Sequence, residues 1–296
     1  IMNEKIKKMN LLILGGSSLL SFLWCKATFE NFNIYLSQHQ RDISYLGFPI
    51  LNVKLDNFRT LASDIIKNEI DIVVNTIGLT NVELCEIEIE KAYYLNAKLP
   101  GIIAKACQFT NTKLIHISTD HFFDKGNKRH TEDDEVFLLN TYAKSKYQGE
   151  IEVLSNLSTA LICRTNFFGY GPNYKLSFSD WIIKSCLANK KIELFHDVYI
   201  SPLCGKNLAL ISLELLRLNC KGIYNLSSDD TITKFAFGIL LCELQGISNS
   251  NIKSGSINDR KDLIQRPNSM ALSNSKASKA LNKGLGKVSK QILDIN

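Results

Sequence analysis

The chain has 296 residues, of which 45% are hydrophobic and 22% are charged, values typical of a soluble globular protein with one large or two modest domains. Its formal charge of +6 is unevenly placed: the segment from Lys253 onward carries nine basic and three acidic residues, and the first 252 residues carry 26 of each. This distribution excludes a uniformly basic surface for nucleic acid. The eight cysteines are never closer than sixteen residues, which excludes a Cys-x-x-Cys metal or dithiol motif and predicts reduced thiols.

Short apolar runs alternate with helical patterns over the first 165 residues. Strands are predicted at Leu11–Leu14, Asn33–Leu36, Asp71–Asn75, Lys113–Ser118 and Thr159–Cys163. Helices are predicted at Asn57–Asn68, at Glu90–Phe109 with a second segment from Pro100, and at Asn140–Ser155. Strands that alternate with helices across short connections form a parallel sheet with right-handed crossovers. The sequence therefore predicts an α/β fold of the Rossmann type, a doubly wound parallel sheet that binds ligands beyond the carboxyl ends of its strands.

The first 26 residues allow a second interpretation. Three lysines precede an apolar stretch, as in a secretory signal peptide. The stretch is interrupted by Gly15-Gly16-Ser17-Ser18 and is too short to span a membrane. A buried strand, a turn of small residues and a helix are therefore favoured, and we expect a cytoplasmic protein with no membrane partner.

The pattern changes after Arg164. The predicted elements are an irregular segment at Asn166–Asn173, helices at Phe178–Asn189, Gly205–Leu218 and Thr231–Leu244, strands at Ile192–Phe195 and Gly222–Leu226, and a loop at 248–258. Near the C-terminus five lysines at helical spacing lie opposite three apolar residues, which predicts one solvated helix: Lys276, Lys279, Lys283, Lys287 and Lys290 against Leu281, Leu285 and Val288. We assign residues 9–165 and 205–228 to a dinucleotide-binding Rossmann domain, and 166–204 and 229–296 to a smaller C-terminal substrate-binding lobe.

The turn after the first strand is a candidate cofactor site. A dinucleotide site needs small residues for a tight turn and for close approach of the pyrophosphate, which lies at the helix N-terminus. Gly15 meets the first need, whereas Ser18 and Ser21 occupy the second and third glycine positions. We therefore place Gly15, Ser17, Ser18 and Leu19 at the cofactor, with an ordinary strand–helix turn as the alternative.

The end of the second strand indicates which cofactor would bind. NAD enzymes usually place an acidic residue there for the ribose hydroxyls. This chain has no acidic residue before Asp42, and Ser37, His39 and Arg41 offer partners for a 2′-phosphate. The pattern favours NADP(H) over NAD(H), and a solvated polar loop is the alternative.

A Tyr-x-x-x-Lys motif is the candidate catalytic element. It occurs twice, at Tyr94/Lys98 and Tyr142/Lys146, so the motif alone decides nothing. The second copy begins a helix after a polar loop, and Thr119 lies upstream at the end of a strand. The i, i+4 spacing places Tyr142 and Lys146 on one helix face, where the ammonium would lower the pKa of the phenol. Such a tyrosine can exchange a proton with a carbonyl or carbinol, and a surface helix is the alternative.

Together these segments resemble the extended short-chain dehydrogenases/reductases, most closely the dTDP-4-dehydrorhamnose reductases, over residues 9–281. The most specific segments are His-Ile-Ser-Thr-Asp-His-Phe-Phe-Asp at 116–124, Thr-Glu-Asp-Asp at 131–134 and Asn-Thr-Tyr-Ala-Lys-Ser-Lys-Tyr-Gln-Gly-Glu at 140–150. The resemblance implies catalytic roles for Thr119, Tyr142 and Lys146, and places Asn75, Thr76 and Asn96 near the cofactor. It further implies substrate contacts for Asp120, His121, Phe167 and Arg266, the last through the phosphates.

The chain departs from the family pattern in the cofactor turn and in the substrate motif. The family has glycine where Ser18 and Ser21 stand, tyrosine where His121 stands, and usually tryptophan where Phe167 stands. The related dehydratases use a glutamate at the position of His121, so the histidine disfavours that activity. No metal-ligand spacing is found among the histidines.

The predicted activity is the NAD(P)H-dependent reduction of a nucleotide-linked 4-keto-6-deoxy sugar. The predicted partner is this nucleotide-diphosphate sugar, with no nucleic acid, and a homodimer is left open. Two other functions are also left open. One is a non-catalytic NADP-binding regulatory subunit resembling the methionine adenosyltransferase beta subunit, and the other is a sugar-nucleotide epimerase.

Overall fold

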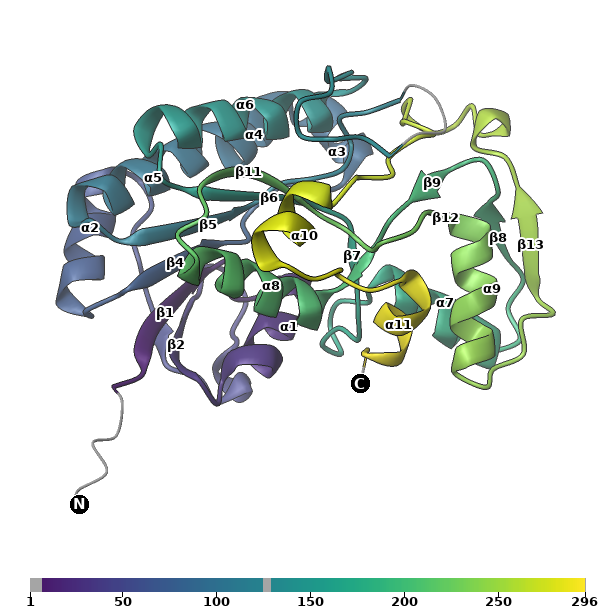
Figure 1. Ribbon diagram of the computed structural model, residues 1–296, viewed down its shortest axis with the longest axis horizontal. Helices are drawn as coiled ribbons and strands as arrows, with labels where there is room; N and C mark the ends of the chain where they lie inside the picture. The colour runs from purple at the N-terminus through teal and green to yellow at the C-terminus, as the bar shows by residue number, and fades with distance from the viewer. Residues whose placement is uncertain (1–6, 125–128, 296) are drawn as a thin grey trace.

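A seven-stranded, entirely parallel sheet forms the centre of the protein (Figure 1). The computed structural model describes residues 7–124 and 129–295. In sheet order the strands are β11 (Gly222–Leu226), β6 (Leu161–Thr165), β5 (Lys113–Ile117), β4 (Ile72–Asn75), β1 (Met9–Leu14), β2 (Phe32–Ser37) and β3 (Ile50–Leu51). The predicted doubly wound Rossmann-type fold is confirmed. The strand order reverses between β1 and β4, and a ligand site is expected beyond the carboxyl ends of these strands.

Helices cover both faces of the sheet because its strands are apolar on both sides. Leu11 and Ile13 of β1 pack into one hydrophobic cluster, whereas Leu12 and Leu14 pack into another, as expected from the two-residue repeat of a strand. The first cluster includes α1 (Leu19–Thr28), α8 (Gly205–Arg217) and α10 (Ser275–Leu281). The second includes α2 (Phe58–Lys67), α5 (Leu99–Thr110) and α6 (Thr141–Asn156), and Figure 1 shows the two sets on opposite faces.

The predicted helix at 90–109 is divided by a π-helical turn. α3 (Val82–Ile87) and α4 (Ile89–Tyr93) lead into the π-helix η2 (Tyr94–Lys98), and α5 follows with Pro100 in its first turn. The backbone of η2 lies against α6 at Gly149, where a Cβ atom would be 2.0 Å from the carbonyl oxygen of Asn96. Glycine therefore allows the close approach of α6, the helix that carries Tyr142 and Lys146.

The C-terminal part of the chain builds most of a smaller lobe, at the right of Figure 1. Its elements are β7 (Phe167–Phe168), α7 (Phe178–Leu187), β8 (Ile192–Phe195), β9 (Tyr199–Ile200), β10 (Leu203–Cys204), β12 (Ile232–Thr233), α9 (Lys234–Leu244) and β13 (Ile252–Gly255). The expectation of a loop over 248–258 was wrong, because β13 pairs in parallel with β8. This strand has a single apolar residue, so backbone pairing rather than side-chain pattern defines it.

The expectation of one continuous helix near the C-terminus was also wrong. The chain forms α10 and α11 (Val288–Leu293), and between them Asn282 and Gly286 adopt left-handed conformations with φ of 52° and 92°. This break lets Leu285 and Val288 both reach the interior.

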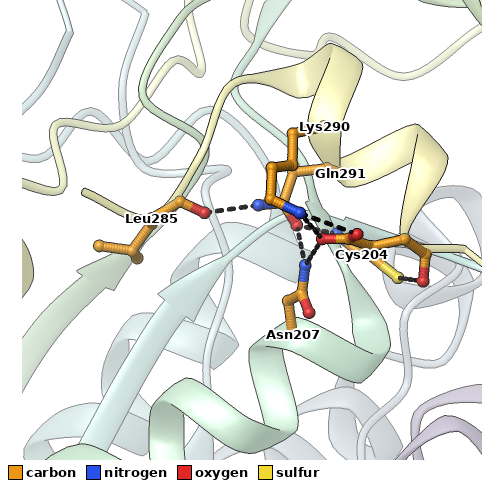
Figure 2. Close-up of polar contacts among 6 residues, drawn as sticks. Cys204, Asn207, Leu285, Lys290 and Gln291 are labelled. Carbon is orange, nitrogen blue, oxygen red and sulfur yellow. Dashed lines mark hydrogen bonds and ion pairs between the residues drawn. The ribbon is translucent and has the colours of Figure 1, made fainter. Parts of the chain in front are cut away.

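A fully buried glutamine holds α11 in place (Figure 2). The Gln291 amide donates to the carbonyl oxygen of Leu285 at 2.6 Å. Its Oε1 accepts from the Cys204 backbone N–H at 3.0 Å and from Asn207 at 2.9 Å. These contacts connect the C-terminal segment to β10 and α8. No helix in the two described ranges is long and apolar enough to cross a membrane.

Candidate active site

A cavity of about 460 Å³ lies beyond the carboxyl ends of the central strands. One side is formed by the start of α1 and by the loop that follows β4. The loop after β5 and the first turns of α6 form a second side, and the lobe supplies the rest. The cavity thus lies where the strand order predicts a ligand site, and its walls come from segments far apart in the sequence.

The structure brings Thr119 and Tyr142 together in this cavity. Both side chains line it, and both are buried, with 4% and 7% of their surface exposed. Burial raises the pKa of the phenol, an effect that the nearby Thr119 hydroxyl opposes. We expected a pKa below the ordinary value of tyrosine, and that direction was wrong for the protein by itself, because removal from water outweighs the other effects.

Lys146 lines the same wall and is fixed to the sheet. Its Nζ donates to the carbonyl oxygen of Ile117 at 2.7 Å, at the end of β5. Burial lowers the pKa of Lys146 to about 8, and the nearby Glu150 carboxylate opposes this shift. The last residue of β5 therefore holds the ammonium group of Lys146 in one position.

Asp120 and His121 follow Thr119 into the cavity. Asp120 is buried, and its Oδ2 accepts from Asn166 at 2.8 Å while its Oδ1 accepts from the Thr119 hydroxyl at 3.4 Å. Burial raises the pKa of Asp120 to about 6. The His121 ring packs edge-on against Tyr142, with centroids 5.3 Å apart, and burial lowers its pKa to about 3. His121 is therefore neutral, and its buried Nδ1 has no hydrogen-bond partner.

The lobe adds basic residues to the cavity, two of which the sequence reasoning missed. Arg266 lines the cavity as predicted and pairs with Glu83, while its Nε has no partner. Lys175 and Lys234 also line the cavity. Neither lies in a motif, so no local signal could have identified them. Phe167, predicted at the substrate, lines the same space.

The turn between β1 and α1 is held by its serines. Gly15 has a φ of 89°, and a Cβ atom there would lie 2.8 Å from the Thr76 hydroxyl. The Ser18 hydroxyl caps α1 by accepting from the Ser21 backbone N–H at 3.0 Å, and it bonds to Thr76 at 2.9 Å. The Ser21 hydroxyl donates to the carbonyl oxygen of Gly15 at 3.0 Å. The serines at the glycine positions thus bond within the turn, and Ser18, Leu19 and Thr76 face the cavity.

Two residues predicted to contact the cofactor, Ser37 and Arg41, do not line the cavity. Their side chains instead contact segments next to it. Ser37 accepts from the Gly15 N–H at 2.9 Å. The guanidinium of Arg41 lies 4.5 Å from the centre of the Tyr174 ring, and the hydroxyl of that tyrosine donates to the carbonyl oxygen of Ser17 at 3.3 Å. These contacts connect the end of β2, the turn and the lobe.

Asn75 and Asn96 form hydrogen bonds with the backbone of the loop after β4. Asn75 accepts from the Ile77 N–H at 3.0 Å. Asn96 accepts from the Leu79 N–H at 2.8 Å and donates to the carbonyl oxygen of the same residue at 3.0 Å. Both asparagines are buried, so they fix the loop that forms one cavity wall.

The chain is similar to known proteins over nearly its whole length. The family model described as the RmlD substrate binding domain matches residues 9–293. The probable low-salt glycan biosynthesis reductase Agl14 of Haloferax volcanii is 27% identical over 260 residues, which cover 86% of each chain. The dTDP-4-dehydrorhamnose reductase of Salmonella typhimurium is 29% identical over 193 residues, 62% of this chain and 63% of the relative.

Solved structures have the same architecture. A hypothetical dTDP-4-dehydrorhamnose reductase from Sulfolobus tokodaii matches with a TM-score of 0.81 and 28% identity, over 94% of this chain and 97% of the other. The dTDP-4-dehydrorhamnose reductase of Bacillus anthracis, solved in complex with NADP, matches with a TM-score of 0.84 and 21% identity, over 98% and 99%. The predicted class of enzyme is confirmed. The chain belongs to the RmlD substrate-binding-domain family of the extended short-chain dehydrogenases/reductases, and it is an oxidoreductase of the reductase type.

Proposed function

We propose that this enzyme uses NADPH to reduce the C4 ketone of a nucleotide-diphosphate-linked 4-keto-6-deoxy sugar. The observation that carries the proposal is the meeting of Thr119, Tyr142 and Lys146 in one cavity that also reaches the N-terminus of α1. The Salmonella relative is named as a reductase of a dTDP-linked keto sugar, and the Bacillus anthracis structure contains NADP. Catalysis is favoured over a regulatory role because all three reactive side chains are present.

The residues around the β1–α1 turn fit a nicotinamide dinucleotide. Gly15 and Gly16 have no space for a side chain, because a Cβ atom on Gly16 would lie 2.6 Å from the carbonyl oxygen of Ser37. The first turn of α1 has backbone N–H groups without partners inside the helix, and such groups attract phosphate. The bound cofactor would supply a hydride to the substrate carbon. We place Arg41 and Ser37 near its 2′-phosphate, where the chain has no acidic side chain before Asp42.

In this proposal each of the three side chains has a distinct task. Tyr142 donates its phenolic proton to the oxygen that becomes the alcohol. Its raised pKa keeps the phenol protonated until that oxygen becomes strongly basic. Thr119 hydrogen-bonds the same oxygen and orients the ketone. Lys146, held by Ile117, supplies a positive charge that stabilises the phenolate left behind.

The basic residues of the lobe fit the anionic part of the substrate. Arg266 carries an unpartnered Nε and lies in the same cavity as Lys175 and Lys234. Guanidinium and ammonium groups are the usual partners of phosphate oxygens. We therefore place the nucleotide diphosphate at the lobe and the sugar in the part of the cavity lined by Thr119, His121 and Tyr142.

The state of the cysteines fits a reducing compartment, and we place the enzyme in the cytoplasm. All eight cysteines are free thiols in the structure, and seven of them are buried. Proteins of oxidising compartments commonly cross-link such residues.

The test is NADPH oxidation with a panel of nucleotide-linked 4-keto-6-deoxy sugars, followed by absorbance. Tyr142→Phe should lower kcat by about 10²- to 10⁴-fold, the contribution typical of a positioned general acid. Tyr94→Phe is the matched control, because Tyr94 belongs to the other Tyr-x-x-x-Lys copy and is 40% exposed. Oxidation at the wild-type rate in Tyr142→Phe would refute the mechanism. Binding of NADPH without reduction of any sugar would favour the regulatory role.

A further inference from the structure

A segment of the lobe is attached to the start of α6, next to Tyr142. The side chain of Ile264 packs against the hydrophobic cluster that contains Tyr142. The carbonyl oxygen of Gln265 accepts a hydrogen bond from the Asn140 side chain at 2.9 Å. The next residue, Arg266, lines the cavity. The lobe segment is therefore fixed to α6 directly before its guanidinium group reaches the cavity.

The side chain of Asn140 makes this attachment and also caps α6. It is buried, with 2% of its surface exposed. Its Oδ1 accepts from the Ala143 backbone N–H at 2.9 Å, while its Nδ2 donates to Gln265. One side chain thus holds the residue that follows Tyr142 and the residue that precedes Arg266.

Two carboxylates of α3 contact the same two segments. Glu86 accepts from the Thr141 backbone N–H at 2.6 Å and from the Thr141 hydroxyl at 2.8 Å. Glu83 pairs with Arg266, and the i, i+3 spacing places both carboxylates on one face of α3. The contacts run from α3 to α6, from α6 to the lobe segment and from there back to α3. This closed ring fixes the position of Arg266 relative to Tyr142.

We propose that Asn140 is a positioning residue that sets the distance between the guanidinium of Arg266 and the phenol of Tyr142, an inference that rests on the proposed function. The substrate in that function carries phosphates at one end and the ketone at the other. When Arg266 binds the phosphates, this distance decides whether the ketone oxygen comes within hydrogen-bond reach of Tyr142. A misplacement of about 1 Å can cost about 10²-fold in rate. Asn140 does not line the cavity, so it acts through the two residues that do.

Asn140→Ser separates the attachment from the cap. Serine is also a favourable N-cap residue, but it lacks the amide that donates to Gln265. Gln265 is exposed, so its carbonyl oxygen can bond to water, and thermal unfolding should remain close to that of the wild type. Asn140→Asp is the second variant, because it also keeps a capping oxygen and lacks the donor.

The measurement compares kcat for the nucleotide-linked keto sugar with the affinities for NADPH and for dTDP as a nucleoside diphosphate probe. Asn140→Ser should lower kcat by about 10- to 100-fold and change each dissociation constant by less than about twofold, because both half-sites remain but are misaligned. Asn57→Ser is the matched control, since Asn57 caps α2 and does not line the cavity. An unchanged kcat would overturn the proposal. Weaker binding of both ligands together with the loss in kcat would also overturn it, because a general structural role would then explain the loss.

A double variant tests the connection to Arg266. Arg266→Met removes the contact with the phosphates, so the position of the lobe segment should no longer affect catalysis. Adding Asn140→Ser to Arg266→Met should then lower kcat/KM by less than about twofold, whereas independent effects would multiply. Multiplied losses would contradict the proposal. If the wild-type protein reduces no keto sugar, the proposed function itself fails, whereas a fully active Asn140→Ser variant refutes the positioning role alone.

Discussion

The buried ion pair of Glu150 and Arg164 contacts Ser118, which lines the candidate active site, and removal of the pair should strongly destabilise the protein. Both side chains are 2% exposed. Arg164 Nε donates to the two carboxylate oxygens at 3.0 and 3.2 Å, and its Nη2 donates to Oε2 at 2.7 Å. The Ser118 hydroxyl donates to Oε1 at 2.6 Å. This network connects α6 to the ends of β5 and β6.

Glu150→Gln removes the negative charge and leaves the Arg164 cation buried beside Phe122 and Phe123. Arg164 Nη1 already has no hydrogen-bond partner, so little remains to compensate the guanidinium. Breaking one side of a buried pair typically costs about 3–5 kcal/mol, and we expect a loss of this size in the free energy of unfolding. Loss of the carboxylate should also lower the pKa of Lys146 further, since Glu150 opposes the effect of burial there.

Urea or thermal unfolding followed by circular dichroism measures this loss. Glu152→Gln is the matched control, because Glu152 lies on the same helix and accepts a side-chain hydrogen bond from Gln148 at 3.0 Å. The double variant Glu150→Met/Arg164→Met should recover part of the stability, since it leaves no isolated charge. A loss below about 1 kcal/mol in Glu150→Gln, the range of an exposed pair, would refute the reasoning.

Two further predictions concern small residues next to the site. Gly149→Ala should cost about 3 kcal/mol of stability, because its Cβ would lie 2.0 Å from the Asn96 backbone. Gly101→Ala is the control, since a Cβ on Gly101 would lie 3.2 Å from a Glu152 side-chain atom. Thermal unfolding of the two variants measures the difference, and equal melting temperatures would contradict the prediction. Ser18→Gly frees the Ser21 backbone N–H from its capping bond and should strengthen NADPH binding in a fluorescence titration, at a stability cost of a few tenths of a kcal/mol. Weaker binding in Ser18→Gly would show that the hydroxyl itself serves the cofactor.

The sequence by itself determined the fold class, because buried parallel strands and amphipathic helices leave strong local patterns. The runs at β1, β4, β5 and β6 are apolar on both faces, and this continuous apolarity is what a sheet covered by helices requires. The i, i+4 spacing was likewise sufficient to place Tyr142 and Lys146 on one side of α6. Patterns of this kind depend on residues close together in the sequence, so they can be recognised without the tertiary structure.

Only the tertiary structure decided how the candidate site is completed and tuned. Lys234 reaches the cavity from the lobe, more than a hundred residues from Thr119, and no spacing rule connects the two residues. In the folded protein the side chains of Asn75 and Asn96 accept hydrogen bonds from the backbone of the loop that forms one cavity wall. The pKa of Tyr142 is raised because the packing of these segments buries the phenol. Burial and long-range contact set the electrostatics of a site, and both arise only when distant segments pack together.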